Sequence, residues 1–144
     1  MFSKACEYGI RSAIFIAEQS MEGKKVSIKD VTQALDSPEA YTSKILQKLK
    51  NNGIIDSEKG PRGGFSIDNE RMESVMLKDI VFTFDGESVY SNCGLGLKQC
   101  NALKPCPVHH QFAIIRDEIN KLLEGSSIKT LALDLQEGLS FLKR

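Results

Sequence analysis

The sequence has no excess of charge of either sign. Nineteen lysines and arginines balance nineteen aspartates and glutamates over 144 residues, which excludes a histone-like polycation and a long acidic tail. No apolar run approaches the ~20 residues of a membrane span, and the stretch from Ala13 to Ala17 is too short for a secretory signal. We therefore expect a cytoplasmic protein of one domain's length that does not contact a membrane.

The motifs of common enzyme sites are also missing. The chain contains no C-x-x-C pair, no G-x-G-x-x-G loop and no Ser/His/Asp spacing of the kind found in hydrolases. Three thiols share one segment, but the sequence offers no base that would activate one of them as a nucleophile. The sequence therefore predicts a binding protein and not an enzyme.

Two helices are expected at the start of the chain. Apolar residues recur at three- and four-residue steps over residues 4–20. After a polar break, Ser27 followed by Asp30 predicts a capping box at the start of a short second helix.

A third helix is expected from Ser37 to about Asn52. Ser37 is predicted to be its N-cap, with Pro38 in the first helical position and Gly53 just past the end. Its inward face is predicted to hold Tyr41, Ile45 and Leu49, and its outward face to hold Thr42, Ser43, Lys44, Gln47 and Lys48. Such side chains can donate to phosphates and to base edges. The simpler interpretation is a solvated helix face.

Two short strands are expected next, at 54–58 and 65–67, joined by a glycine-rich tip at 59–64. Helix, short helix, turn, helix and hairpin follow one another as in a winged helix-turn-helix, which places its second helix in the major groove of DNA. Residues 41–64 carry five basic side chains against two acidic ones, so a small basic surface can bind a polyanion. The candidate DNA-binding residues are Ser37, Tyr41, Thr42, Ser43, Lys44, Gln47, Lys48, Lys59, Arg62 and Gly63, with a solvated loop arginine as the alternative for Arg62.

The second half begins with a short buried element and a long loop. Residues 76–84 predict a helix, although a strand is possible, and residues 86–107 form a loop with three cysteines. A helix over 108–124 carries an apolar seam at alternating four- and three-residue steps. Ser127 is expected to cap a last helix, whose inward residues are Ile128, Leu131, Leu135, Leu139 and Leu142.

The three loop cysteines indicate metal or redox chemistry. The spacing is Cys93-x6-Cys100-x5-Cys106 with His109 three residues later, and thiolates favour iron–sulfur clusters, zinc or copper(I). It is not the C-x2-C of a zinc ribbon. An iron–sulfur cluster, a zinc site, an adventitious disulfide and unliganded thiols all stay open. Cys6 is expected to be a buried small apolar residue.

Specific segments resemble a known family over nearly the whole chain. They are Glu7-Tyr-Gly-Ile-Arg-Ser-Ala, Ser37-Pro-Glu-Ala-Tyr-Thr-Ser-Lys-Ile-Leu-Gln-Lys-Leu49, Gly53-Ile-Ile55, Lys59-Gly-Pro-Arg-Gly-Gly-Phe65, the cysteine triplet, and Ser127-Ile-Lys-Thr-Leu131. With them the chain resembles the winged-helix transcription regulators that include IscR and NsrR. The first two cysteines stand one residue further apart than the family usually has them.

The resemblance implies a mainly helical homodimer that binds a palindromic site in double-stranded DNA. Residues 1–75 would form the winged helix-turn-helix, and residues 76–144 the cysteine loop and dimerisation helices, with the last helix packed on the first in one compact unit. It further implies a cluster, 2Fe–2S in preference to 4Fe–4S, on Cys93, Cys100 and Cys106, which an aerobic preparation can lose. In IscR-like members a histidine at the position of His109 is the fourth ligand. In others an acidic residue of the partner chain, at the position of Glu7, takes this role. The cluster would sense redox state, nitric oxide or iron–sulfur status.

Overall fold

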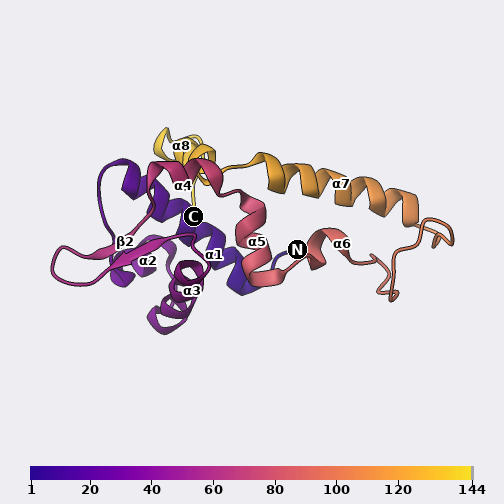
Figure 1. The fold of residues 1–144 in the computed structure, drawn as a ribbon, viewed down its shortest axis with the longest axis horizontal. Coiled ribbons are helices and arrows are strands. Elements are labelled where there is room, and N and C mark those ends of the chain that lie inside the picture. Colours follow the sequence, from indigo (N-terminus) through magenta and orange to yellow (C-terminus); the bar gives the residue numbers. More distant parts are fainter. Residues whose placement is uncertain (144) are drawn as a thin grey trace.

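The computed structural model describes residues 1–143, so the predicted second part ends one residue beyond the described chain. The chain is mainly helical with a two-stranded antiparallel hairpin, as predicted (Figure 1). Its elements are α1 Lys4–Met21, α2 Ile28–Leu35, α3 Glu39–Asn51, β1 Asp56–Glu58, β2 Gly64–Ser66, α4 Asn69–Ser74, α5 Leu77–Asp85, α6 Ser88–Ser91, α7 His109–Gly125 and α8 Ile128–Gln136.

Local capping explains where two of the helices begin. The Ser27 hydroxyl accepts from the Asp30 N–H at 3.1 Å, and the Asp30 carboxylate accepts from the Ser27 N–H at 2.8 Å. This capping box starts α2 as predicted. The Ser127 hydroxyl likewise accepts from the Thr130 N–H at 3.1 Å at the start of α8.

The predicted N-cap of α3 is wrong. Pro38 occupies the N-cap position without a side-chain cap, and the helix begins at Glu39. The Ser37 hydroxyl is instead 2.7 Å from the Thr42 hydroxyl. Because the Thr42 hydroxyl already donates to the Pro38 carbonyl, the Ser37 hydroxyl is the donor in this contact, which holds its side chain at Thr42 and away from the first amides of α3. The far end agrees with the prediction, since Gly53 follows the C-cap with a φ of 72°.

The hairpin is tied to the body of the protein at its base. Its strands pair Asp56 with Ser66, Ser57 with Phe65 and Glu58 with Gly64. Val26 and Phe65 exchange both backbone hydrogen bonds, at 2.8 and 3.1 Å. Gly64 has a φ of 139°, and a Cβ there would lie 2.8 Å from the Val26 carbonyl oxygen. Glycine therefore permits the close approach that fixes the hairpin beside α2.

The main core is built around α1, which packs against α2, α3, α5 and α8. Ile16 of α1, Leu46 of α3, Ile80 of α5 and Ile128 of α8 are all fully buried. The 76–84 segment is a helix and not a strand. The inward placement predicted for Leu139 is wrong, because α8 ends at Gln136 and Leu139 is 71% exposed. Two short helices, α4 and α6, had not been predicted.

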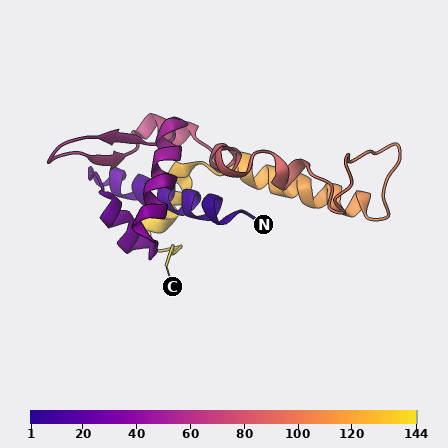
Figure 2. The ribbon, with the colours of Figure 1, turned by 90° about the horizontal axis from the view of Figure 1, so that it is seen from below.

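The helix α7 extends away from the body, and the part of the cysteine loop that follows α6, residues 92–107, lies at its far end (Figures 1 and 2). Its near end is held by a Lys78–Glu124 ion pair at 2.6 Å and by a backbone hydrogen bond from Leu77 N–H to the Ser126 carbonyl at 2.8 Å. Helices α5 and α6 pack along one side of it. The loop is therefore presented on an arm, apart from the helix-turn-helix.

Candidate nucleic-acid interface and cysteine loop

The outer side of α3 presents a polar surface. Ser43, Lys44, Gln47 and Lys48 are exposed, while Ile45 and Leu49 are buried as predicted. We call the exposed surface the recognition face and include Asn51, whose side-chain oxygen accepts from Gln47 Nε2 at 2.9 Å. Sequence reasoning missed Asn51, although its position one helical turn after Gln47 could have revealed it.

Thr42 does not belong to this face, which corrects the prediction. Its side chain is 2% exposed. Its hydroxyl donates to the Pro38 carbonyl at 2.9 Å and contacts the Ser37 hydroxyl at 2.7 Å. A side chain enclosed in this way cannot reach a base edge, so Thr42 is a structural residue of the turn between α2 and α3.

Tyr41 lies at the border of the recognition face. It is half-buried, and its ring meets Tyr8 edge to face with centroids 5.4 Å apart. Lys48 Nζ lies 5.1 Å from the Phe84 ring centroid. These contacts hold two of the candidate side chains against α1 and α5.

The tip of the hairpin, residues 59–64, carries further cations and projects beyond the body of the protein (Figures 1 and 2). Lys59 and Arg62 are exposed, and within residues 1–143 neither of them forms an ion pair. The Gly63 N–H donates to the Gly60 carbonyl at 3.0 Å. A Cβ on Gly63 would overlap the Glu58 carbonyl. Gly63 therefore shapes the turn that presents Arg62.

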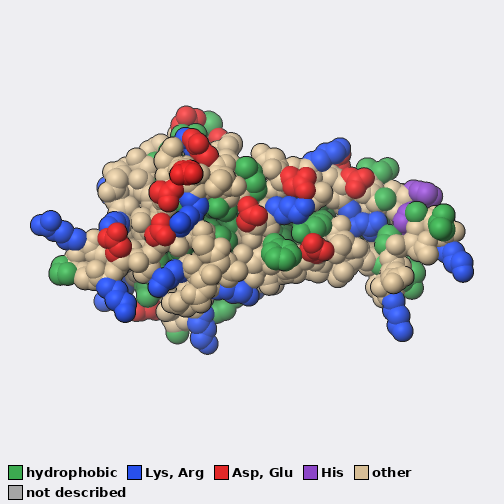
Figure 3. Space-filling model, in the orientation of Figure 1, with side chains coloured by type: hydrophobic (Ala, Val, Ile, Leu, Met, Phe, Trp, Pro, Cys, Tyr) green, Lys and Arg blue, Asp and Glu red, His purple; other side chains and the backbone are tan. Residues whose placement is uncertain are grey.

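Charge is unevenly distributed over the face seen in Figure 3. Basic side chains project from the hairpin end and from the edge below α3, whereas acidic side chains gather over α4 and α8. A polyanion would approach the first surface and be repelled from the second. The separation gives a neutral chain one side suited to DNA.

The structure brings two of the predicted metal-binding side chains together at the tip of the arm. Cys100 Sγ lies 3.3 Å from Nδ1 of His109, and His109 is the first residue of α7. All four cysteines of the chain carry free thiols. Within residues 1–143, no three His, Cys, Asp or Glu side chains already form a metal site.

Cys93 and Cys106 form the other part of the site. The backbone N–H groups of Leu95 and Leu97 donate to Cys93 and lower the pKa of its thiol, and Cys106 is a further hydrogen-bonding neighbour. A thiolate is the form that ligates metal. Cys93 and Cys100 also line one cavity of about 280 Å³, which far exceeds the ~30 Å³ share of one water molecule.

Arg116 is a contact of this site that sequence reasoning missed. From the third turn of α7, its Nη2 donates to Cys100 Sγ at 3.2 Å and its Nη1 to the Asn92 carbonyl at 3.4 Å. Its position seven residues after His109, two turns along the same helix, is the signal that could have found it.

Glu7 and Cys6 lie in the first two turns of α1, and Cys6 belongs to a buried cluster against which Val89 and Tyr90 of α6 pack. The Lys4 ammonium donates to the Glu7 carboxylate at 2.9 Å and lowers its pKa. Cys6 is fully buried as predicted, and this burial raises the pKa of its thiol to about 12. Within one chain, neither of them is a neighbour of the loop thiols.

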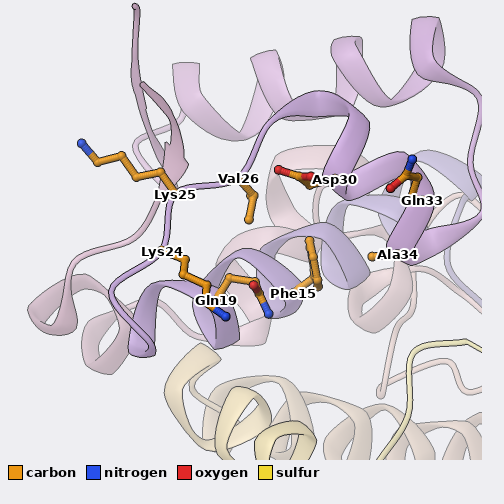
Figure 4. A pocket seen from close by; sticks show the side chains of 8 residues that line it. All are labelled: Phe15, Gln19, Lys24, Lys25, Val26, Asp30, Gln33 and Ala34. Carbon is orange, nitrogen blue, oxygen red and sulfur yellow. The ribbon is translucent and has the colours of Figure 1, made fainter. Parts of the chain in front are cut away.

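A separate cavity of about 570 Å³ lies between α1 and α2 (Figure 4). Its wall is polar and apolar in equal parts, with Phe15, Val26 and Ala34 beside five polar or charged residues. Cofactor pockets are mostly apolar with a few placed polar groups. The cysteine loop is therefore the better candidate for a sensing site.

A helix-turn-helix with an exposed second helix and a basic hairpin beside it defines a DNA-binding protein of the winged-helix class. The family model of Rrf2, described as an iron-dependent transcriptional regulator, matches residues 2–134. The chain belongs to the Rrf2 family, whose members are DNA-binding transcription regulators and not enzymes.

Curated relatives and solved structures agree with this assignment. The chain is similar to a protein described as an HTH-type transcriptional regulator in Aquifex aeolicus, at 28% identity over 91% of this chain and 90% of the relative. It is also similar to IscR of Photorhabdus laumondii, at 25% identity over 86% of this chain and 74% of that relative.

Two solved structures share the fold. The structure of CymR, the global cysteine regulator of B. subtilis, superposes with a TM-score of 0.76 at 22% identity and covers 92% of this chain and 96% of that one. T. potens IscR superposes with a TM-score of 0.72 at 16% identity, and the match covers 97% of this chain and 91% of that one. Both confirm the predicted winged helix-turn-helix architecture.

In residues 1–143, no helix has the length and apolar character needed to cross a membrane.

Proposed function

We propose that the chain is a homodimeric regulator that binds a palindromic DNA site and is controlled by an iron–sulfur cluster on the cysteine loop. The observation that carries the DNA part is the exposed recognition face of α3, followed in the chain by a hairpin whose tip exposes Lys59 and Arg62. Residues 1–75 would contact DNA, and residues 76–144 would sense and dimerise. Because its target is the chromosome, the protein would act in the cytoplasm.

An exposed apolar surface on α7 supports the homodimer. Leu123 is the buried residue of this helix, whereas Ile114, Ile115 and Leu122 are 65%, 52% and 57% exposed. A helix of 17 residues spans roughly 25 Å, which is long enough to cross a second copy of itself. Three large apolar side chains this exposed on one helix are typical of an interaction surface, and a twofold partner suits a twofold-symmetric DNA site.

The chemistry of the loop side chains fits an iron–sulfur cluster. Cys93 with Cys106 and Cys100 with His109 give two pairs of donors, and each iron of a 2Fe–2S cluster takes two protein ligands. Such a cluster, when bound, supplies one-electron redox chemistry and reactivity toward nitric oxide. Glu7 of the partner chain is the alternative to His109 as fourth ligand.

The covalent path from loop to helix supports control of DNA binding. The loop leads directly into α7, so a change in the loop acts on the helix that would join the two copies. DNA half-sites lie one turn, ~34 Å, apart, and the separation of the two recognition helices must match this distance. A switch needs only about 1–3 kcal/mol of coupling free energy between the cysteine loop and the DNA-binding surface.

The DNA part is tested by selecting duplexes from a random pool and measuring affinity for the selected sequence against salt. We expect a palindrome, and we expect Lys44→Gln and Arg62→Gln each to weaken binding. The slope of log K against log salt should fall by ~0.9 per lost phosphate contact. Lys121→Gln on α7, which removes an exposed cation paired with Glu118, is the control. Unchanged affinity in both variants would remove these residues from the interface.

The cluster part is tested by iron, sulfide and zinc analysis of protein isolated and reconstituted without oxygen. Wild type should bind iron and sulfide in equal amounts and absorb visible light, and Cys100→Ala should not. Comparing His109→Ala with Glu7→Gln then identifies the fourth ligand. Wild-type protein that stays colourless and iron-free after reconstitution would reject the cluster.

A metal-free thiol switch is the second candidate. It is favoured by the lowered pKa of Cys93 and its contact with Cys106, since a thiolate beside a second thiol is the arrangement that oxidises most readily. Zinc in the isolated protein would point instead to a zinc-held loop. Hydrogen peroxide, a two-electron oxidant that is reduced to water, should join Cys93 and Cys106 in a disulfide. This product, with DNA affinity altered and no metal bound, would establish the switch.

A further inference from the structure

Arg116 joins the two halves of the candidate cluster site. Its guanidinium reaches Cys100 Sγ at 3.2 Å and the carbonyl of Asn92, the residue before Cys93, at 3.4 Å. None of the ion pairs within residues 1–143 involves Arg116. Its charge therefore faces the loop and not a carboxylate.

The cysteine loop has few other attachments to the rest of the chain. Apolar packing anchors only the first part of the loop, where Val89 and Tyr90 of α6 lie against a buried cluster that includes Leu77 and Leu123. Beyond α6, the leucines of the loop, Leu95, Leu97 and Leu103, are 53%, 55% and 92% exposed. Gly94 lies against the Phe112 ring, where a Cβ would come within 2.7 Å. Polar contacts from α7, by Arg116 and His109, supply the remaining ties.

We propose that Arg116 is a positioning residue that holds the cysteine loop against α7 and tunes the reduction potential of the cluster. This inference rests on the proposed function. A planar guanidinium can donate to a sulfur and to a carbonyl at once, which a lysine ammonium cannot do in the same geometry. Hydrogen bonds to ligating sulfurs and nearby positive charge favour the reduced, more negative cluster.

Arg116 also connects the site to the apolar surface of α7. It follows Ile114 and Ile115 directly, and both are more than half exposed. A change in what Cys100 binds therefore acts, through one side chain, on the helix that would contact the partner. Arg116 thus adds a side-chain path from the loop to the proposed dimer interface, beside the covalent path at the start of α7.

The test compares Arg116→Gln, Arg116→Lys and the control Lys121→Gln, which removes a cation from the same helix without touching the loop. In metal-free protein, hydrogen exchange of the amides of residues 92–106 should be faster in Arg116→Gln than in wild type. In reconstituted protein, the midpoint potential should fall, and the affinity for iron should drop ~10–100-fold. Arg116→Lys keeps the positive charge, so its midpoint potential should lie between those of Arg116→Gln and wild type. Its amides at residues 92–106 should exchange nearly as fast as in Arg116→Gln.

The outcomes separate this inference from the proposed function. If wild type binds no iron, the cluster is rejected, while hydrogen exchange in the metal-free protein still decides whether Arg116 holds the loop. If Arg116→Gln matches Lys121→Gln in both exchange and potential, the role of Arg116 is overturned. A fall in potential with unchanged exchange would leave the tuning role and refute the positioning role.

Discussion

Replacing Thr42 with valine should separate stability from DNA binding. Thr42 lies in the middle of the sequence segment that faces DNA in a winged helix, yet its side chain is 2% exposed. Valine keeps the volume and the β-branch, and its helix propensity is close to that of threonine. The substitution therefore removes only the hydroxyl.

The expected loss of stability follows from the hydrogen bonds. The Thr42 hydroxyl donates to the Pro38 carbonyl at 2.9 Å and meets the Ser37 hydroxyl at 2.7 Å. The Pro38 carbonyl keeps the Thr42 N–H as a donor at 2.9 Å, and the half-buried Ser37 hydroxyl can turn to water. Two bonds at about 0.5–1.5 kcal/mol each, partly offset by easier burial of a methyl group, give a loss of about 1–2 kcal/mol.

The assay pairs urea unfolding with DNA titration. Thr42→Val should lower the free energy of unfolding and the melting temperature, the latter by roughly 3–6 °C, while the folded protein keeps its DNA affinity within about threefold. Lys44→Gln should weaken DNA binding and leave the free energy of unfolding unchanged within about 0.5 kcal/mol. The slope of log K against log salt should fall in magnitude by about 1 per half-site.

The opposite pattern would refute the reasoning. If Thr42→Val loses DNA affinity more than tenfold at full stability, Thr42 contacts DNA, and the orientation of α3 in the structure is wrong. Thr42→Ser is the matched control, because it keeps the hydroxyl and should retain more stability than valine if the hydrogen bonds matter.

Three further predictions concern buried and exposed positions. Burial raises the pKa of the Cys6 thiol above 9.0, to about 12, so the stability that the neutral thiol contributes is present below pH 9 and lost as pH rises from there toward 12. Relative to Cys6→Ala, the wild-type unfolding free energy should fall by up to about 1.4 kcal/mol per pH unit in that range; parallel curves would contradict this. Gly9→Ala would place a Cβ into the Phe84 ring. The ~1 kcal/mol gained in helix propensity is outweighed by overpacking of about 1–3 kcal/mol, so a thermal melt should show net destabilisation and not a gain. Ile115→Glu should convert the dimer to a monomer in sedimentation velocity while helix content is kept, and a dimer that persists would place the interface elsewhere.

The arrangement of local elements could be predicted from the sequence. Ser27 with Asp30, Gly53, and Ser127 each act within a few residues of their own position, so their helix boundaries follow from short-range hydrogen bonds and backbone freedom. The apolar periodicity of residues 4–20 and 108–124 likewise depends only on the helical repeat. These local features, in their order, determined a mainly helical protein with a hairpin wing and a cysteine loop.

Tertiary structure alone decided which side chains are available. The contact between Ser37 and Thr42 removed one residue from the DNA-facing surface, and the end of α8 at Gln136 left Leu139 exposed. The meeting of Arg116 with Cys100 joins residues sixteen apart in sequence through a loop with no local repeat. Periodicity assigns a residue to a face of its own helix, but burial depends on what the rest of the chain brings against that face, and only the folded arrangement specifies this.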